Sequence, residues 1–193
     1  YAGHIYSVWW RDHFVPEFVA RTRNSGRQIN QHVHPIEEKY GGFFNLPHFT
    51  HNFSSLVLAE KYAVEHPEYF ALRDGKRMAK DGDLDRCVTN PDVIRISADT
   101  LREWMLADPE AEVFSLVQAD SSVSCLCDRC VETYNRYSTR PGIDLAHVLT
   151  WGGLSGRNLQ FANQVAKILE KEFPKKRIGI WAYQASRNPP RNI

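Results

Sequence analysis

The sequence lacks an excess of charge of either sign. Its 24 Lys and Arg residues against 23 Asp and Glu residues leave a formal net charge of +1, and the basic residues are spread along the chain. Because a phosphate backbone is bound by clustered cations, we do not expect nucleic acid as a partner. No apolar run approaches the roughly 20 residues that cross a bilayer, so no transmembrane segment is expected.

Internal repeats, low-complexity stretches and an initiator methionine are also missing. The first residues, Tyr1 to His4, show no signal-peptide pattern. Segment 177–183 (RIGIWAY) is typical of a buried strand, yet only ten residues follow it. Since a buried strand needs covering elements, we expect the chain to have been cut from a larger protein rather than processed at its start.

What the sequence does contain is a core-forming composition, with 42% apolar and 12% aromatic residues, and alternating helical and extended patterns. Asn90-Pro91-Asp92 is a strong helix start, and Asp74-Gly75 is a hairpin turn signal. Helices are predicted over residues 16–24, 55–65, 91–107, 127–137 and 155–173. Extended segments are predicted over residues 28–34, 46–53, 113–118 and 177–183, with a hairpin over residues 69–76.

This alternation predicts parallel βαβ units, which occur in doubly wound sheets and in (β/α)8 barrels. No glycine-rich phosphate loop follows a predicted strand, which counts against a nucleotide-binding doubly wound fold. A complete barrel needs about 250 residues. We therefore predict an α/β fold, a (β/α)8 TIM barrel present as an incomplete fragment, with residues 1–193 forming the middle portion of a single domain.

Parallel barrels carry their chemistry at the carboxyl ends of the strands. Gln118 and Asp120 follow the apolar run 113–117 and, being two apart on an extended backbone, share one face. A carboxylate at this place can protonate a leaving oxygen, stabilise positive charge or orient a substrate amide. The alternative is that Asp120 caps the next helix, because Asp-Ser-Ser is an ordinary capping sequence.

Two other strand ends carry histidine and aromatic side chains. His48 and His51 end one segment, and Trp181 and Tyr183 end the last one. Their rings suit contacts with the hydroxyl and C–H groups of a sugar, and packing in the core is the alternative. His32 and His34 form an H-x-H pair, and His48 and His51 form an H-x2-H pair. A catalytic metal is not favoured, because such pairs are weak signals without a matched partner motif.

The four cysteines are Cys87 and the closely spaced Cys125, Cys127 and Cys130. Three thiols within six residues are typical of a shared structural feature. Four thiolates would suit a structural tetrahedral zinc, and two disulfides are the alternative in an exported protein. Both alternatives require the sulfur of Cys87 to lie within about 7 Å of a sulfur in the cluster.

Four segments in fixed order resemble a bacterial family long labelled as of unknown function: residues 66–77 (HPEYFALRDGKR), 87–93 (CVTNPDV), 115–130 (SLVQAD followed by CLCDRC) and 158–190 (NLQFANQVAKILEKEFPKKRIGIWAYQASRNPP). That family is similar to the α-glucuronidase and hexosaminidase barrels. It includes glycoside hydrolase family one hundred and sixty-three, endo-β-N-acetylglucosaminidases that act on complex N-glycans. The family pattern has Gln-Asn-Asp where this chain has Gln118-Ala119-Asp120.

The resemblance implies a glycosidase-like (β/α)8 catalytic domain in a secreted, cell-surface or periplasmic bacterial protein that degrades glycans. It implies a retaining glycoside hydrolase acting on N-acetylglucosamine-containing glycans or glycoproteins, without a catalytic cofactor. The substrate's own acetamido group is a candidate nucleophile. Asp120 would either orient or polarise that group or serve as the acid of the reaction. A second carboxylate is required. The candidates for it are Glu68 and an acid that follows Ile193 in a longer protein. The alternatives are a non-catalytic carbohydrate-binding barrel, since Ala119 replaces an amide, and a zinc-stabilised interaction domain.

Overall fold

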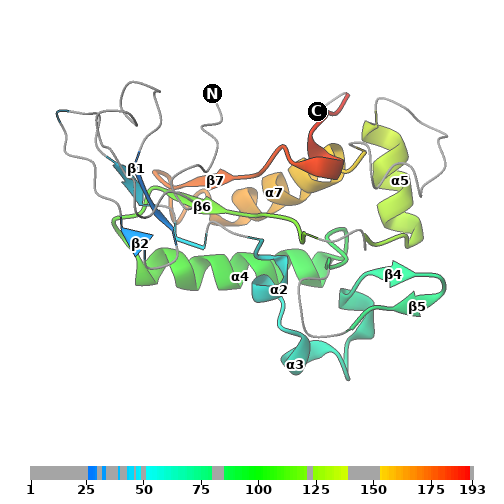
Figure 1. Cartoon of the computed structure of the whole chain (residues 1–193). Helices are drawn as coiled ribbons and strands as arrows, with labels where there is room; N and C mark the ends of the chain where they lie inside the picture. Colours follow the sequence, from blue (N-terminus) through cyan, green and yellow to red (C-terminus); the bar gives the residue numbers. More distant parts are fainter. Residues whose placement is uncertain are drawn as a thin grey trace.

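The computed structural model describes residues 26–29, 32–33, 39, 43–45, 47–48, 51–79, 85–120, 124–138 and 153–191 (Figure 1). The helix predicted over residues 16–24 lies outside this part of the chain. The first described elements are three short strands, β1 (Gly26–Ile29), β2 (His32–Val33) and β3 (Phe43–Asn45). Strand β1 pairs antiparallel with β2 and parallel with β3.

The strand pair that positions the candidate site is parallel, as the alternation of elements predicts. Strand β6 (Val113–Ser115) pairs with β7 (Arg177–Gly179), with Phe114 opposite Ile178. The described residues between these strands in the sequence include the helices α5 (Asp128–Tyr137) and α7 (Ser155–Leu169). Figure 1 shows β6 and β7 side by side, with α7 and the long helix α4 near them. Strand β7 is only half-buried at Ile178, so it is less enclosed than its sequence indicates.

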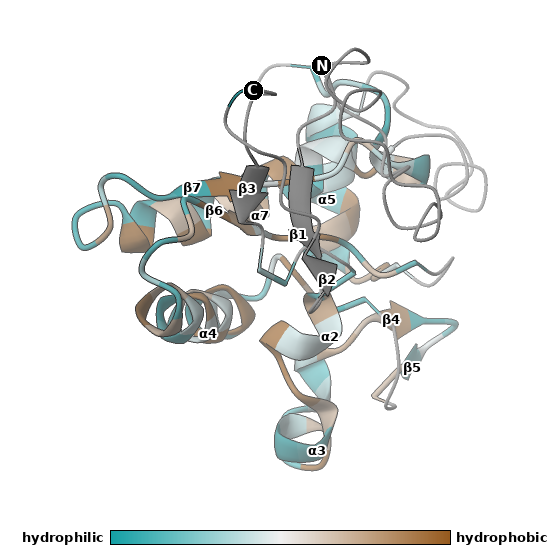
Figure 2. Ribbon diagram, turned by 60° about the vertical axis from the view of Figure 1, so that its left-hand side comes forward, coloured by the Kyte–Doolittle hydropathy of each residue, from teal (hydrophilic) through white to brown (hydrophobic). Residues whose placement is uncertain are grey.

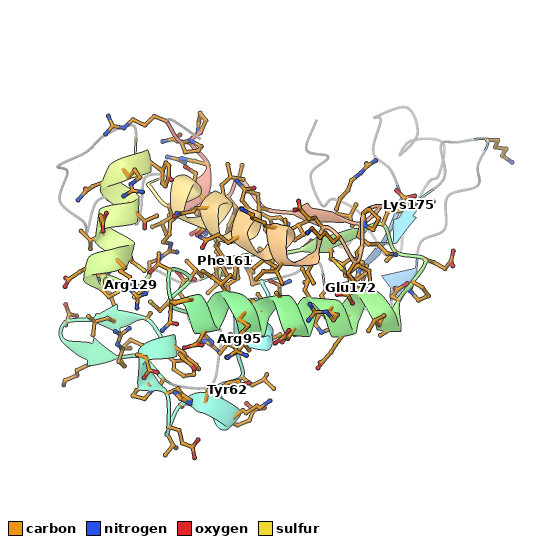
Figure 3. All side chains as sticks on the ribbon, turned by 180° about the vertical axis from the view of Figure 1, so that it is seen from behind. Tyr62, Arg95, Arg129, Phe161, Glu172 and Lys175 are labelled. Carbon is orange, nitrogen blue, oxygen red and sulfur yellow. The ribbon has the colours of Figure 1, made fainter. Side chains whose placement is uncertain are left out.

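Helix α4 (Pro91–Ala107) confirms the predicted start and end. The side chain of Asn90 accepts a hydrogen bond of 2.9 Å from the backbone N–H of Asp92, which satisfies a donor that the first turn leaves open. The core lies between α4, α7 and β6, and its largest buried side chains include Phe53, Leu101, Phe114, Phe161 and Val165. Phe161 points from α7 toward α4 in Figure 3, and Figure 2 shows hydrophobic stretches on β6 and β7 beside these helices.

The predicted hairpin is also present. Strands β4 (Leu72–Arg73) and β5 (Lys76–Arg77) pair antiparallel around Asp74 and Gly75, which both have positive φ, of 48° and 73°. Such a turn matches the twist of the strands and favours Asp-Gly. The carbonyl of Leu72 accepts a hydrogen bond of 2.9 Å from the backbone N–H of Leu126. The hairpin is thereby tied to the segment that carries three of the four cysteines.

The single helix predicted over residues 55–65 is wrong. The structure has two short helices, α2 (Phe53–Leu56) and α3 (Ala59–Tyr62), followed by the 3-10 helix η3 (Pro67–Tyr69). The buried side chain of Arg86 donates hydrogen bonds to the carbonyls of Val57 (2.7 Å) and Ser54 (3.2 Å). Val57 has an extended backbone, which interrupts the helix. In a continuous helix the carbonyls of Ser54 and Val57 would accept hydrogen bonds from backbone N–H groups four residues later, but here they accept them from the Arg86 guanidinium.

Other predicted segments differ from the structure. The described residues of the extended segment predicted over 46–53 contain no strand; they form a turn at Pro47 and His48 and enter helix α2 at Phe53. Helix α7 ends at Leu169 instead of residue 173. The described residues form three small sheets and no closed barrel, so the barrel fragment stays a prediction. Within the same residues, no helix is long and apolar enough to cross a membrane.

Candidate functional site

The chain that follows β6 is held in a defined path by Asn52. The side-chain amide of Asn52 donates a hydrogen bond of 2.6 Å to the carbonyl of Ser115, and its carbonyl oxygen accepts one of 2.9 Å from the N–H of Val117. The backbone N–H of Asn52 also donates to the carbonyl of Val117, at 3.0 Å. These bonds bring residue 51 beside residues 118–120, so polar side chains from two segments meet at the carboxyl end of the strand.

Asp120 stands where the sequence predicts it, after the apolar strand and on the same side as the end of β7. Its Oδ1 accepts a hydrogen bond from the Tyr183 hydroxyl at 3.2 Å and another from Nε2 of Gln184 at 3.1 Å. Nε2 of Gln184 also donates to the Tyr183 hydroxyl oxygen at 2.8 Å. The Asp120 side chain is 46% exposed. The carboxylate is therefore oriented by two neighbours and still accessible to a ligand.

His51 faces the other oxygen of this carboxylate. Its Nε2 lies 3.8 Å from Oδ2 of Asp120, and its Nδ1 lies 2.6 Å from the carbonyl oxygen of Gln118. A carbonyl only accepts hydrogen bonds, so Nδ1 carries a proton and Nε2 is the nitrogen that faces Asp120. The distance of 3.8 Å exceeds a direct hydrogen bond, and the two groups are placed to share a ligand or a water molecule.

Trp181 and Tyr183 give this site an aromatic border. The His51 ring lies 5.1 Å from the Trp181 ring and 5.7 Å from the Tyr183 ring, centroid to centroid. Both aromatic side chains are half-buried, so neither is packed fully in the core. Half-buried rings beside a carboxylate offer apolar faces to a ligand while their edges pack against the protein.

Gln118 is brought to the site, but its side chain is used within the protein. It is buried, its Nε2 donates to the carbonyl of Tyr183 at 3.1 Å, and its Oε1 accepts from Nδ2 of Asn158 on α7. Gln118 thus connects β6, α7 and the segment after β7. This arrangement suits a residue that positions Tyr183, rather than one that contacts a ligand.

His48 is separate from this group. Its ring stacks on Trp104 of α4 with a centroid distance of 3.8 Å and an interplanar angle of 9°. Partial burial there lowers the pKa of His48, although Asp108 acts in the opposite direction. The backbone at His48 has a φ of 54°, which is typical of a turn. Of the two histidines named from the sequence, only His51 lies beside Asp120.

The capping alternative for Asp120 is not supported by the described helix that follows. Helix α5 begins at Asp128, and Cys127 occupies its N-cap position. Asp120 is therefore too early in the sequence to cap α5. Its side-chain contacts to Tyr183 and Gln184 come from the other strand end.

A buried ion pair lies directly behind the site, and sequence reasoning missed it. Asp85 and Arg157 are 2% and 1% exposed, and Nη2 of Arg157 lies 3.0 Å from Oδ2 of Asp85. Oδ1 of Asp85 accepts a hydrogen bond of 3.3 Å from the backbone N–H of Ala119. Burial opposes the charged form of Arg157, yet the negative charges of Asp85 and of the Cys130 and Cys125 sulfurs outweigh it and raise the pKa of Arg157.

A sequence signal for part of this network does exist. Arg157 and Asn158 precede Phe161, Val165 and Leu169 at helical spacing, so both polar residues fall on the apolar stripe of α7. A polar residue on such a stripe must be satisfied inside the fold. No comparable pattern surrounds Asp85.

The four cysteines come together, as the sequence predicts. Their sulfur atoms all lie within 4.8 Å of one another, and Sγ of Cys87 is 3.6 Å from that of Cys127 and 3.9 Å from that of Cys130. All four are free thiols in the structure. Hydrogen bonding within the cluster, first from Cys125, lowers the pKa of Cys87 to about 6. The cluster could bind a metal ion.

The comparisons with known proteins identify a family and nothing more specific. Neither the comparison with curated proteins nor the comparison with solved structures found a match. A family model described as "Domain of unknown function (DUF4838)" matches residues 4–193. This match covers the site around Asp120 and the cysteine cluster, and the chain therefore belongs to the DUF4838 family.

Proposed function

We propose that this chain belongs to the catalytic part of a retaining glycoside hydrolase that acts on N-acetylglucosamine-containing glycans. The observation that carries the proposal is the convergence of Asp120, Tyr183, Gln184 and His51 at the ends of two parallel strands. Carboxylates at this position perform glycoside hydrolysis in many barrels. The resemblance to endo-β-N-acetylglucosaminidases supplies the sugar class.

Asp120 is suited to the role of orienting the substrate's acetamido group. When the acetamido oxygen attacks the anomeric carbon, positive charge develops on the amide, and a carboxylate that accepts its N–H stabilises that charge. The bonds from Tyr183 and Gln184 fix the direction of the carboxylate before the substrate arrives. Preorganised groups cost little reorganisation during the reaction, which favours this assignment over a freely rotating surface acid.

The second carboxylate of the reaction is assigned to a residue outside the described part of the chain. Glu68 is on η3, where it pairs with His66 at 3.1 Å. Asp85 is buried against Arg157. Neither presents a carboxyl group to a ligand beside Asp120, so the group that protonates the leaving oxygen must come from elsewhere.

We also propose that the complete domain is a (β/α)8 barrel in a secreted or cell-surface bacterial protein. The parallel pair of β6 and β7, with helices α5 and α7 between them in sequence, supports a βαβ architecture. Asp120, Tyr183 and Gln184 follow the carboxyl ends of these strands, which is where barrel enzymes carry their chemistry.

Glycan binding without turnover is the second candidate function. Ala119 is buried at 4% exposure, and the resembled family has an asparagine at this position. A methyl group cannot replace the hydrogen bonds of an amide. The aromatic border of Trp181, Tyr183 and His51 would still hold a sugar.

One experiment separates the two candidates. The protein is incubated with a complex N-glycopeptide, and released glycan is measured by mass spectrometry while glycan binding is measured by calorimetry. Release of a glycan with a new reducing end supports the hydrolase. Binding without release supports the second candidate, and the absence of both contradicts the carbohydrate site.

We propose zinc as the metal of the cysteine cluster. Four sulfur ligands at about 2.3 Å from a tetrahedral zinc are separated from one another by about 3.8 Å. The observed separations of 3.6 Å and 3.9 Å agree with this value, whereas disulfide sulfurs are bonded at about 2.05 Å. A site with four protein ligands leaves no open position for catalysis, so the proposed role of the metal is structural.

A further inference from the structure

We infer that the cysteine cluster, as a tetrathiolate zinc centre, positions the Asp120 strand end through Arg157 and Asp85. The inference rests on the zinc proposal and is independent of the substrate. Arg157 would balance the negative charge of the metal centre and would also hold the Asp85 carboxylate in place through their ion pair. Arg157 and Asp85 are positioning residues in this account, since neither contacts a ligand of Asp120.

The surroundings of the sulfur atoms suit thiolates. The backbone N–H of Leu72 donates to Sγ of Cys125 at 3.4 Å, and the hydroxyl of Thr89 lies 3.1 Å from Sγ of Cys130. Nη1 of Arg77 lies 4.0 Å from Sγ of Cys125. Metal ligands are commonly held by such outer hydrogen-bond donors, which fix their direction and balance their charge. Disulfide sulfurs have no negative charge that would need these donors.

Charge balance explains the burial of Arg157. Four thiolates around a divalent zinc carry a net charge of −2, and an uncompensated buried charge is strongly unfavourable. Arg157 is 1% exposed and forms an ion pair of 3.0 Å with Asp85, which is two residues before the cluster's Cys87. Its Nη1 is buried and makes no hydrogen bond within the described residues. A cation held in this way fits a negatively charged neighbour better than a neutral group of thiols or disulfides.

Asp85 connects the cysteine cluster to the strand end that carries Asp120, through the chain on one side and through hydrogen bonds on the other. Asp85 is two residues before Cys87, and its two carboxylate oxygens bind Arg157 and the N–H of Ala119. Ala119 is followed directly by Asp120. The next described segment after Asp120 starts at residue 124 and leads into Cys125. The metal therefore fixes the chain on both sides of the strand end.

Removal of the metal should loosen this strand end. Without zinc, the loop that carries Cys87 loses its anchor, and Arg157 loses part of its counter-charge. The Asp85–Ala119 hydrogen bond is then less often formed, so the Ala119 amide exchanges its hydrogen faster. If the protein is a glycosidase, the loss should appear mainly in kcat, because the reacting geometry changes while the aromatic border stays.

The test combines zinc analysis with hydrogen exchange resolved at the Ala119 amide, neither of which uses a glycan. We expect one zinc per chain, cysteines that are alkylated only after chelation, and Ala119 exchange at least about tenfold faster in the metal-free protein. Asp85→Asn should keep its zinc and show the same faster exchange. Asp74→Asn is the matched control, because it makes the same chemical change in the exposed β4–β5 turn.

Each outcome decides one part of the account. Disulfides or the absence of zinc would overturn both the zinc proposal and the positioning role. Bound zinc with unchanged Ala119 exchange after chelation would overturn the positioning role alone. If chelation unfolds the whole chain, zinc-loaded Arg157→Lys decides: faster Ala119 exchange with retained zinc supports the coupling, and unchanged exchange contradicts it.

Discussion

The hydroxyl of Tyr183 donates a hydrogen bond of 3.2 Å to Oδ1 of Asp120, although 63 residues separate them in the sequence. The two residues meet because they follow the parallel strands β7 and β6, whose carboxyl ends lie at the same edge. Gln184 contacts both groups and completes a three-membered arrangement.

Replacing Tyr183 by phenylalanine should reduce activity without affecting the fold. The Tyr183→Phe variant keeps the ring beside His51 and Trp181 and loses only the hydroxyl that holds Asp120. Since this hydrogen bond is exposed, we expect a change in the free energy of unfolding below about 1 kcal/mol. The rate of glycan release should fall by about 10- to 100-fold. Unchanged release from Tyr183→Phe would show that the hydroxyl has no part in the reaction.

The two histidines should behave differently under the same substitution. His51→Asn removes the ring between Gln118 and Asp120 and should lower glycan release at least about tenfold. His48→Asn removes a ring stacked on Trp104 and should leave release unchanged. Steady-state kinetics on both variants provide the comparison. Equal losses in the two variants would contradict the separation of His48 from the site.

The positive φ of Gln184 should lower the stability of the fold for any residue other than glycine at this position. Its φ of 45° is in the left-handed region, which costs a non-glycine residue about 1 kcal/mol or more. Gln184→Ala and Gln184→Gly both remove the amide that contacts Asp120, but glycine adopts this φ without strain. Denaturant unfolding should find the glycine variant the more stable of the two. Equal stability would show that the backbone relaxes without cost.

His48 should make stability depend on pH. Its pKa in the folded state lies below the ordinary value of 6.5, so the fold favours the neutral ring. The contribution of His48 is therefore complete above pH 6.5 and is lost as the pH falls through the lowered folded-state pKa. The unfolding free energy of the unmodified protein should fall more steeply below pH 6.5 than that of His48→Asn. Parallel curves for the two proteins would contradict this effect.

The sequence predicts the local elements best where a specific side chain sets a boundary. The capping side chain of Asn90 and the Asp74-Gly75 turn act within a few residues, and both features are present in the structure. The helix predicted over residues 55–65 fails because Arg86, from a distant segment, binds the carbonyls of Ser54 and Val57. Such long-range interactions do not follow from periodicity.

The rule that barrel chemistry lies at strand ends predicts Asp120 and Tyr183 at the candidate site, but it misses Gln184. Alternation with a period of two selects Trp181 and Tyr183 and places Gln184 on the opposite face. The chain instead forms a 3-10 helix (η4, Gln184–Ser186) at this point, and the side-chain amide of Gln184 therefore lies within hydrogen-bond distance of Asp120. The pairing of Asp85 with Arg157 is a tertiary contact between charged residues, which no local pattern indicates.

The glycosidase proposal is tested most directly by the activity and the melting temperature of Asp120→Asn, measured side by side with the Asp74→Asn control. We predict that the unmodified protein and the control release glycan from a complex N-glycopeptide. Asp120→Asn should lose at least about 100-fold in rate and melt at nearly the same temperature, because the Asp120 side chain is 46% exposed. Full activity of Asp120→Asn, or a large drop in its melting temperature with glycan binding intact, would contradict the assignment of Asp120 to catalysis.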